Sequence, residues 1–206
     1  MKHIWKYYLL ALVVIGIDQA IKLAVHYNMA IGAPGQIKIL GDWFKIYYTL
    51  NPGMAFGLKI GFKYGKLMLT AGRIVATILI GQHMWHLAQA AEKTPLVLAG
   101  WALILGGALG NVWDSVFYGV LLENAPADTP LAWFHGQVID MFYVDIWETR
   151  LPQWIPWVGG LYFSFFPIFN FADVAIFLGI ASILVFPRLS AQRTLTMVDD
   201  REHFAV

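Results

Sequence analysis

The chain contains no cysteine, and only 13% of its 206 residues are charged. The missing thiol excludes disulfide bonds, zinc sites with thiolate ligands, a cysteine nucleophile and a lipid attached to a cysteine of this chain. A soluble domain carries about a quarter charged residues, so the shortage of charge argues against a disordered chain and against most water-soluble enzymes. The net charge of +1 provides no strongly basic face, and we therefore expect no nucleic-acid partner.

Apolar side chains take the place of the missing charges. They make up 59% of the chain, and the mean hydropathy is +0.61. A membrane-spanning helix needs about 20 mostly apolar residues. Four segments meet this requirement, at about 4–25, 66–90, 96–113 and 168–187. The sequence therefore predicts an all-α membrane protein with four transmembrane helices, in which residues 1–206 form a single integral membrane domain.

The start of the chain, MKHIWKYYLLALVVIG, also fits a secretory signal peptide, because a basic end precedes an apolar run. No small-residue cleavage site follows, and the apolar run continues past Asp18 to Val25, which favours an uncleaved first helix. Four spans place both termini on one side of the membrane. The lysines and arginines that flank the spans favour the cytoplasm for that side.

Two long connections, 26–65 and 114–167, then lie on the opposite side. In the first, the β-prone segments Ile37–Leu40 and Phe44–Leu50 flank a turn at Gly41–Asp42, so we expect a small extramembrane β-sheet. The second ends in many aromatic residues between Trp147 and Phe166. Tryptophan and tyrosine favour the headgroup level, which predicts an interfacial segment. An anchoring belt and a lipid-binding groove are both open as roles for these rings.

Polar side chains gather at the end of the spans that faces the long connections. Such groups are costly inside a bilayer, so each one is a functional hypothesis. The members of this set are Asp18, Gln19, Lys22, Asn51, Asn111, Asp114, Asp140, Asn170 and Asp173. Asp18 and Lys22 have the i,i+4 spacing of an intrahelical ion pair, for which we expect a structural role. Asn170 fits the N-cap of the fourth helix, which places Asp173 in the first turn.

Two aspartates in one small site can hydrolyse a peptide bond. One carboxylate acts as general base on a water, and the other, protonated, donates to the carbonyl oxygen and later to the leaving amine. This chemistry requires no metal and no cofactor. Asp140 and Asp173 are the candidate pair nearest the same membrane surface, and Asp114 is a competitor. Spacing alone does not choose among the three.

Five motifs in this order resemble the lipoprotein signal peptidase family, also called signal peptidase II. They are DQAIK (18–22), NPGMAFG (51–57), GGALGNVWD (106–114), VIDM (138–141) and FNFAD (169–173). The resemblance implies an aspartic intramembrane endopeptidase that removes the signal peptide from diacylglyceryl-modified prolipoproteins and cuts before the lipidated cysteine. It also implies that Asp140 and Asp173 form the catalytic pair.

The same resemblance implies supporting roles for Asp18, Lys22, Asn51, Asn111, Asp114 and Asn170. It implies a multi-pass protein of the bacterial cytoplasmic (inner) membrane, with cytoplasmic termini and an active site toward the extracytoplasmic face. The implied partners are prolipoproteins, membrane lipids and globomycin-type inhibitors. We expect the protein to be a monomer, without a metal or a cofactor.

Two departures from the family pattern stand out. Ser115 occupies a position where the family usually has arginine, and Arg150 is a candidate replacement for the missing cation. Residues 119–137, GVLLENAPADTPLAWFHGQ, are longer than the usual link between the motifs, and their composition predicts an exposed loop and a candidate lid.

Two other classes of function compete with a peptidase. A transporter or proton pathway predicts polar groups through the whole depth of the bilayer, whereas here Arg73 is the one charge near the middle of a span. A membrane scaffold without enzymatic activity explains the aromatic belt but leaves the clustered aspartates and asparagines unexplained.

Overall fold

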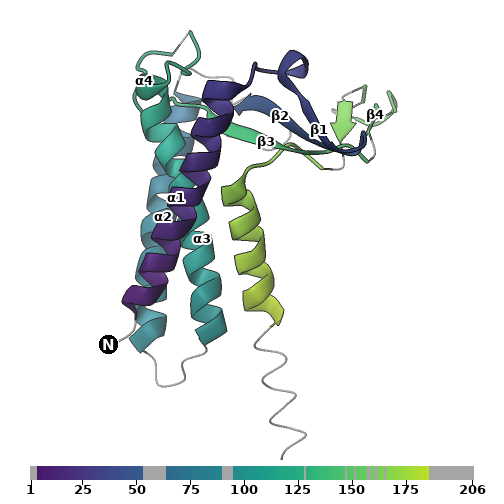
Figure 1. Cartoon of the computed structure of the whole chain (residues 1–206). Coiled ribbons are helices and arrows are strands. Elements are labelled where there is room, and N and C mark those ends of the chain that lie inside the picture. Colours follow the sequence, from purple (N-terminus) through teal and green to yellow (C-terminus); the bar gives the residue numbers. More distant parts are fainter. Residues whose placement is uncertain are drawn as a thin grey trace, which may run out of the picture. The chain divides into compact units, whose positions relative to one another are not determined.

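The computed structural model describes residues 4–52, 64–89, 95–127, 129–146, 148–150, 152–156, 159–160, 162–164 and 166–185. Its helical elements are α1 (Trp5–Asn28), the short η1 (Ala33–Gly35), α2 (Gly65–Gln89), α3 (Pro95–Trp113), the π-helical η3 (Asp114–Tyr118), α4 (Gly119–Leu121) and an apolar helix at Phe171–Val185. Its strands are β1 (Ile37–Leu40), β2 (Phe44–Asn51), β3 (Val138–Val144), β4 (Glu148–Arg150) and β5 (Tyr162–Ser164) (Figure 1).

Three helices in the described part of the chain are long and apolar enough to cross a membrane. They are Trp5–Asn28, Gly65–Gln89 and the continuous Pro95–Leu121, with mean hydropathies of 1.9, 1.3 and 1.7. The first two coincide with predicted spans, and the third contains the predicted span 96–113 and extends beyond it. The helix Phe171–Val185 is also apolar but is shorter than the predicted segment 168–187. The protein is therefore a mostly helical, multi-pass membrane protein.

The third helix continues past the end of its apolar segment, which corrects the predicted connection 114–167. Helical residues extend through η3 and α4 as far as Leu121. Hydropathy falls at Asp114 because aspartate is ionisable, but its side chain is fully buried inside the protein, and the apolar Leu121 at the end of the helix is 61% exposed. Polarity at this point therefore marks an interior site and not the end of the helix.

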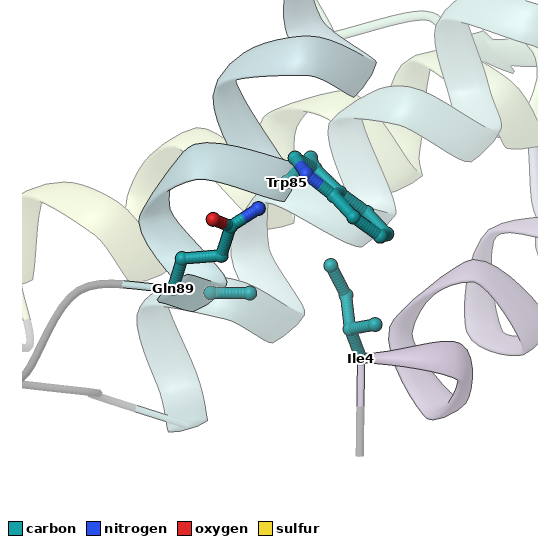
Figure 2. Close-up of a pocket in the computed structure, with 4 residues that line it drawn as sticks. Ile4, Trp85 and Gln89 are labelled. Atoms are coloured by element: carbon teal, nitrogen blue, oxygen red, sulfur yellow. The ribbon is translucent and has the colours of Figure 1, made fainter. Parts of the chain in front are cut away.

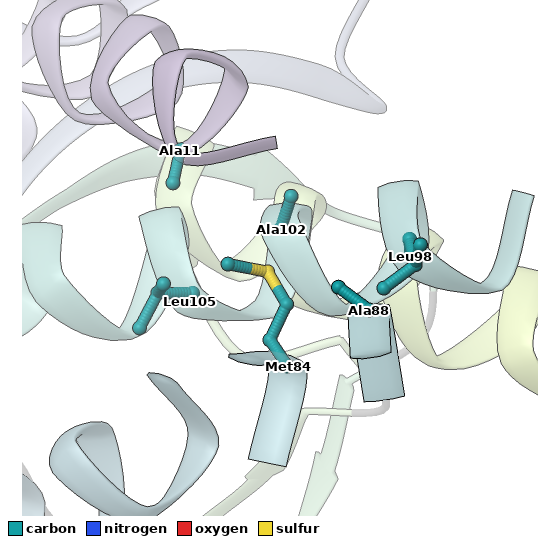
Figure 3. Packing of buried hydrophobic residues seen from close by; sticks show 6 residues of the cluster. All are labelled: Ala11, Met84, Ala88, Leu98, Ala102 and Leu105. Atoms are coloured by element: carbon teal, nitrogen blue, oxygen red, sulfur yellow. The ribbon is translucent and has the colours of Figure 1, made fainter. Parts of the chain in front are cut away.

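The chain divides into two compact units. The helix unit comprises Met1–Gly16, Arg73–Gly110 and Ala172–Val206, and the sheet unit comprises Ile17–Gly72 and Asn111–Phe171. The core of the helix unit joins residues of α1, α2 and α3 (Figure 3), and its members are Ala11, Met84, Ala88, Leu98, Ala102 and Leu105.

Two glycines of the GGALG motif bring helices of this unit close together. A Cβ added to Gly106 would lie 2.8 Å from the carbonyl oxygen of Ala11, and one added to Gly107 would lie 2.8 Å from Cγ1 of Ile176. Small residues permit such close packing of membrane helices. The helix Phe171–Val185 therefore packs directly against α3 within the helix unit.

The sheet unit contains a three-stranded antiparallel sheet in the order β1-β2-β3. β1 and β2 confirm the predicted strands, and Gly41 between them has a φ of 55°. β3 is a strand that the sequence did not predict, and it places Asp140 opposite Thr49 of β2. β4 and β5 form a second, two-stranded sheet.

The predicted interfacial segment is described only in part. Trp154 is 80% exposed, whereas Trp147, Trp157 and Phe165 lie outside the described residues. Residues 53–57 of the NPGMAFG motif lie outside them as well.

A buried tyrosine connects the end of α1 to β2. The hydroxyl of Tyr48 lies 2.8 Å from Nδ1 of His26, and the backbone of Tyr48 accepts a hydrogen bond from the amide of Gly32 at 2.9 Å. Burial raises the pKa of the Tyr48 phenol above its ordinary value. The residue lies next to Thr49, so this connection helps to fix the register of β2 against β3.

Candidate active site

Lys22 of α1 lies at the centre of a buried ionic cluster. Its ammonium group lies 2.7 Å from Oδ2 of Asp18 and 2.6 Å from Oδ2 of Asp114, and it donates to Oδ1 of Asn111 at 3.0 Å. The ammonium group is thus surrounded by two carboxylate oxygens and one amide oxygen. The side chains of both ion pairs are 0% exposed. The predicted Asp18–Lys22 pair is confirmed. Lys22 also contacts Asn111 of α3 and Asp114 of η3.

Gln19 and Tyr118 extend this cluster. Gln19 was predicted to belong to the polar set but was given no role in the site, and Tyr118 was not predicted. The amide nitrogen of Gln19 donates to Oδ2 of Asp18 at 3.0 Å and to Oδ1 of Asp114 at 2.9 Å. The buried hydroxyl of Tyr118 donates to Oε1 of Gln19 at 2.7 Å. The DQAIK motif contained a signal for Gln19, since it follows Asp18 directly. Nothing in the sequence distinguishes Tyr118 from other aromatic residues. Its place in the cluster is evident only from its hydrogen bond to Gln19.

Asp140 of β3 is held between two side-chain amides. Asn51 donates to Oδ2 of Asp140 at 2.8 Å, and Asn170 donates to Oδ1 at 2.6 Å. The aspartate is 2% exposed, and its neighbours Ile139 and Met141 are fully buried. With one amide donor on each oxygen, the plane of the carboxylate is fixed.

Asn111 joins the lysine cluster to Asp140. Its Oδ1 accepts from the ammonium of Lys22 at 3.0 Å and from the amide nitrogen of Asn170 at 3.2 Å. Asn170 in turn donates to Asp140. Seven of the eight predicted site residues therefore belong to one hydrogen-bonded network of the sheet unit. They are Asp18, Lys22, Asn51, Asn111, Asp114, Asp140 and Asn170.

Asp173, the eighth predicted residue, is half-buried and belongs to the helix unit. It is the third residue of the helix Phe171–Val185, and Asn170 directly precedes that helix, as the sequence predicted. The first turn of a helix favours a negative charge. The pairing of Asp173 with Asp140 stays a prediction.

The structure also locates the two departures from the family pattern. Ser115 is fully buried and donates to the backbone oxygen of Asn111 at 2.9 Å, so a short side chain fits there. Arg150, the candidate replacement for an arginine, lies exposed on β4. The segment 119–137 is exposed at Leu131 and Trp133 but buried at Asn124 and His135. The prediction of an exposed loop therefore holds only for part of the segment.

The functional groups of the network are carboxylates, amides, the ammonium group of Lys22 and the hydroxyl of Tyr118. Within the described ranges, no three histidine, aspartate or glutamate side chains come together as metal ligands. A small pocket of the helix unit is lined by Ile4, Trp85, Ala88 and Gln89 (Figure 2). Its lining contains one amide and no carboxylate, so it offers no acid or base.

Comparisons with known sequences place this chain in a family. The family described as Signal peptidase (SPase) II matches residues 10–187. A protein of Amoebophilus asiaticus (strain 5a2) named lipoprotein signal peptidase is 51% identical over 201 residues, which cover 98% of this chain and 85% of the relative. A protein of the same name from Porphyromonas gingivalis is 39% identical over 183 residues, covering 84% of this chain and 78% of the relative.

Solved structures agree at the level of the fold. Two structures, each titled as a bacterial membrane enzyme structure obtained by the in meso method, match with a TM-score of 0.59. One is 21% identical and covers 93% of this chain and 92% of its own; the other is 23% identical and covers 89% and 92%. With the family match over residues 10–187 and the close relatives, the chain belongs to the signal peptidase II family and is a membrane peptidase.

Proposed function

We propose that this chain is an aspartic peptidase that removes the signal peptide from diacylglyceryl-modified prolipoproteins and cuts before the lipidated cysteine. Its relatives are named lipoprotein signal peptidase, which supports the substrate class. The observation that carries the chemistry is Asp140, a buried carboxylate held by the amides of Asn51 and Asn170. Asp173 follows three residues after Asn170 and supplies the second carboxylate.

In the proposed reaction, Asp140 and Asp173 share one proton, because two carboxylates in a small site do not both ionise readily. The ionised carboxylate takes a proton from a water, and the oxygen of that water forms a bond to the scissile carbonyl carbon. The protonated carboxyl donates to the carbonyl oxygen. When the tetrahedral intermediate collapses, the C–N bond breaks and the cysteine nitrogen takes its proton from an aspartate.

The remaining network residues hold Asp140 in place for this step. Lys22 fixes Asn111, and Asn111 and Asp140 together fix the amide of Asn170. A catalytic carboxylate must be held within a fraction of an ångström of its productive position, and supporting hydrogen bonds supply that constraint. We assign supporting roles to Asp18, Lys22, Asn51, Asn111, Asp114 and Asn170 on this basis.

The proposed protein acts as one membrane domain with four spans, the fourth being the helix Phe171–Val185. Its termini lie in the cytoplasm, and the active site faces the extracytoplasmic side of the bacterial inner membrane. The long apolar helices support insertion. Lipid-modified prolipoproteins would reach the site from the bilayer, and a globomycin-type inhibitor would compete with them.

The test replaces each proposed catalytic carboxylate by its isosteric amide. Asp140→Asn and Asp173→Asn should each lower the turnover of a diacylglyceryl prolipoprotein by about a thousandfold, within the range of general acid–base catalysis. Turnover is measured with purified protein in detergent, and the unfolding temperature is measured in parallel.

Asp42→Asn provides a matched control. Asp42 is exposed and pairs with Lys38 at 2.5 Å on the surface of the sheet, so this variant should turn over at the rate of the original chain. Original turnover in both Asp140→Asn and Asp173→Asn would overturn the catalytic pair.

A further inference from the structure

The segment 119–137 returns to the helix that it leaves. The amide of Phe134 donates to the carbonyl oxygen of Val116 at 3.1 Å, and the amide of Gly136 donates to that of Ser115 at 3.0 Å. Both carbonyls belong to the π-helical η3. π-Helical turns are rare and are concentrated at functional sites. The segment thus binds the backbone of the turn that carries Asp114 and Tyr118.

Two glycines make this approach possible. A Cβ added to Gly136 would lie 2.7 Å from the amide nitrogen of Gly119 and 3.1 Å from that of Tyr118. A Cβ added to Gly119 would lie 3.0 Å from the carbonyl carbon of Ala132. All of these neighbours are backbone atoms, which cannot rotate away as a flexible side chain can. Even the methyl group of alanine would force the segment away from η3.

Further hydrogen bonds fix the segment at both of its ends. Asn124 and Gln137 make three with each other, at 2.9, 3.0 and 2.7 Å, and these close the loop at its base. The fully buried hydroxyl of Thr70 in α2 lies within hydrogen-bond distance of two acceptors, the carbonyl oxygen of Phe134 at 2.9 Å and that of Lys66, one turn earlier in α2, at 3.0 Å. The docked part is therefore attached to α2 as well as to η3.

The docked segment meets the polar network on two sides. On one side, Asp114 and Tyr118 are the first and last residues of η3, and both bond to Gln19. On the other side, Gln137 directly precedes β3, which carries Asp140 as its third residue. A displacement of the segment would therefore shift the partners of Lys22 and the start of the catalytic strand together.

We infer that residues 119–137 form a brace that positions the catalytic network, and that they do not act as a lid. The inference rests on the proposed role of Asp140. The residues of the brace are positioning residues, because they act through η3 and β3 and not on the substrate. A lid must move away from the protein in each turnover, whereas the brace stays bound to η3.

The test separates positioning from binding. Gly136→Ala pushes the segment away from η3, and Thr70→Val removes the hydroxyl that holds Phe134 while keeping the side-chain volume. We expect kcat to fall by about tenfold or more in both variants, because small displacements of catalytic groups are costly, while KM changes less than twofold. Kinetics are measured with a diacylglyceryl prolipoprotein below the unfolding temperature of each variant.

Two substitutions serve as controls. Gly72→Ala makes the same change in α2, where a Cβ would meet nothing within 4 Å, and should leave kcat unchanged. Thr70→Ser keeps the hydroxyl and should restore most of the kcat that Thr70→Val loses.

Measuring Asp140→Asn in the same series separates the two proposals. Full activity of Asp140→Asn would overturn the proposed function. A second outcome would overturn the brace alone. In it, Asp140→Asn is inactive, but Gly136→Ala and Thr70→Val have the same kcat as Gly72→Ala. A raised KM at unchanged kcat would also overturn the brace, because it indicates a role in capturing the substrate.

Discussion

At the scale of single residues, Lys22 compensates two buried carboxylates with one positive charge. Asp18 and Asp114 both lie within ion-pair distance of its ammonium group, and all three side chains are 0% exposed. Removing one partner of a buried pair is more costly than never forming the pair, because the remaining charge stays buried. Lys22 is therefore the residue of the cluster whose loss leaves the most uncompensated charge.

We expect Lys22→Met to lower the free energy of unfolding by about 3–5 kcal/mol, the cost of an uncompensated buried charge. Methionine keeps the length of the side chain, so the effect reports the charge and the lost donors. Chemical unfolding in detergent measures it. Lys38→Met is the matched control, since Lys38 and Asp42 form an exposed pair, and it should change nothing measurable. Equal stabilities of the two variants would contradict the role assigned to Lys22.

Part of this site follows from the sequence alone. The Asp18–Lys22 pair was predictable because an i,i+4 spacing on a helix is a local property. The gathering of seven site residues was also predictable, since the cost of polar groups in a bilayer limits where they occur. The hydrogen-bond partners of these residues were not predictable. Tyr118 and Gln19, for example, are 99 residues apart in the sequence and come into contact only in the folded chain. The position of Asp140 between two amides likewise depends on non-local strand pairing.

At the scale of elements, the apolar length of a helix is a strong signal and strand pairing is a weak one. The first three predicted spans coincide with α1, α2 and α3. β3 was missed because residues 138–144, VIDMFYV, lack the polar alternation of a half-exposed strand and are buried at their first four positions. The π-helical η3 was missed because nothing in DSVFY distinguishes it from an α-helical turn; its carbonyls meet the docked segment only in the folded chain.

The connection between α1 and β2 predicts a dependence on alkaline pH. Burial raises the pKa of Tyr48, so the folded chain holds the phenolic proton more tightly than the unfolded chain does. The stability that this provides is complete below the unfolded pKa of about 10 and is lost as the pH rises through the folded pKa. The unfolding temperature should therefore fall above that pH.

Tyr48→Phe should remove part of this alkaline loss. At neutral pH it should lower the free energy of unfolding by about 1 kcal/mol, because the hydrogen bond with His26 is lost. Unfolding temperatures of both chains at a series of pH values in detergent provide the measurement. An identical alkaline slope in the two chains would show that Tyr48 makes no contribution to it.

At the scale of the whole molecule, the proposed orientation can be tested because the chain has no thiol of its own. Any single introduced cysteine is then the only site for a maleimide. Leu131→Cys lies at an exposed position of the segment 119–137 and should react with a membrane-impermeant maleimide in intact spheroplasts. Lys93→Cys, in the short connection between the second and third spans, should react only after lysis. The reverse pattern would place the termini outside the cytoplasm.

The direction of each hydrogen bond around Lys22 has a consequence for which substitutions the site tolerates. An ammonium group can only donate, so Asn111 must present its oxygen to Lys22. Asn170 must then present its nitrogen to that oxygen, and the same nitrogen faces Asp140. An isosteric carboxylate at Asn170 would remove the nitrogen that donates to both oxygens and would set a second carboxylate against Asp140. The direction of these hydrogen bonds, which starts from the ammonium of Lys22, thus makes asparagine-to-aspartate exchange at Asn170 incompatible with its two contacts.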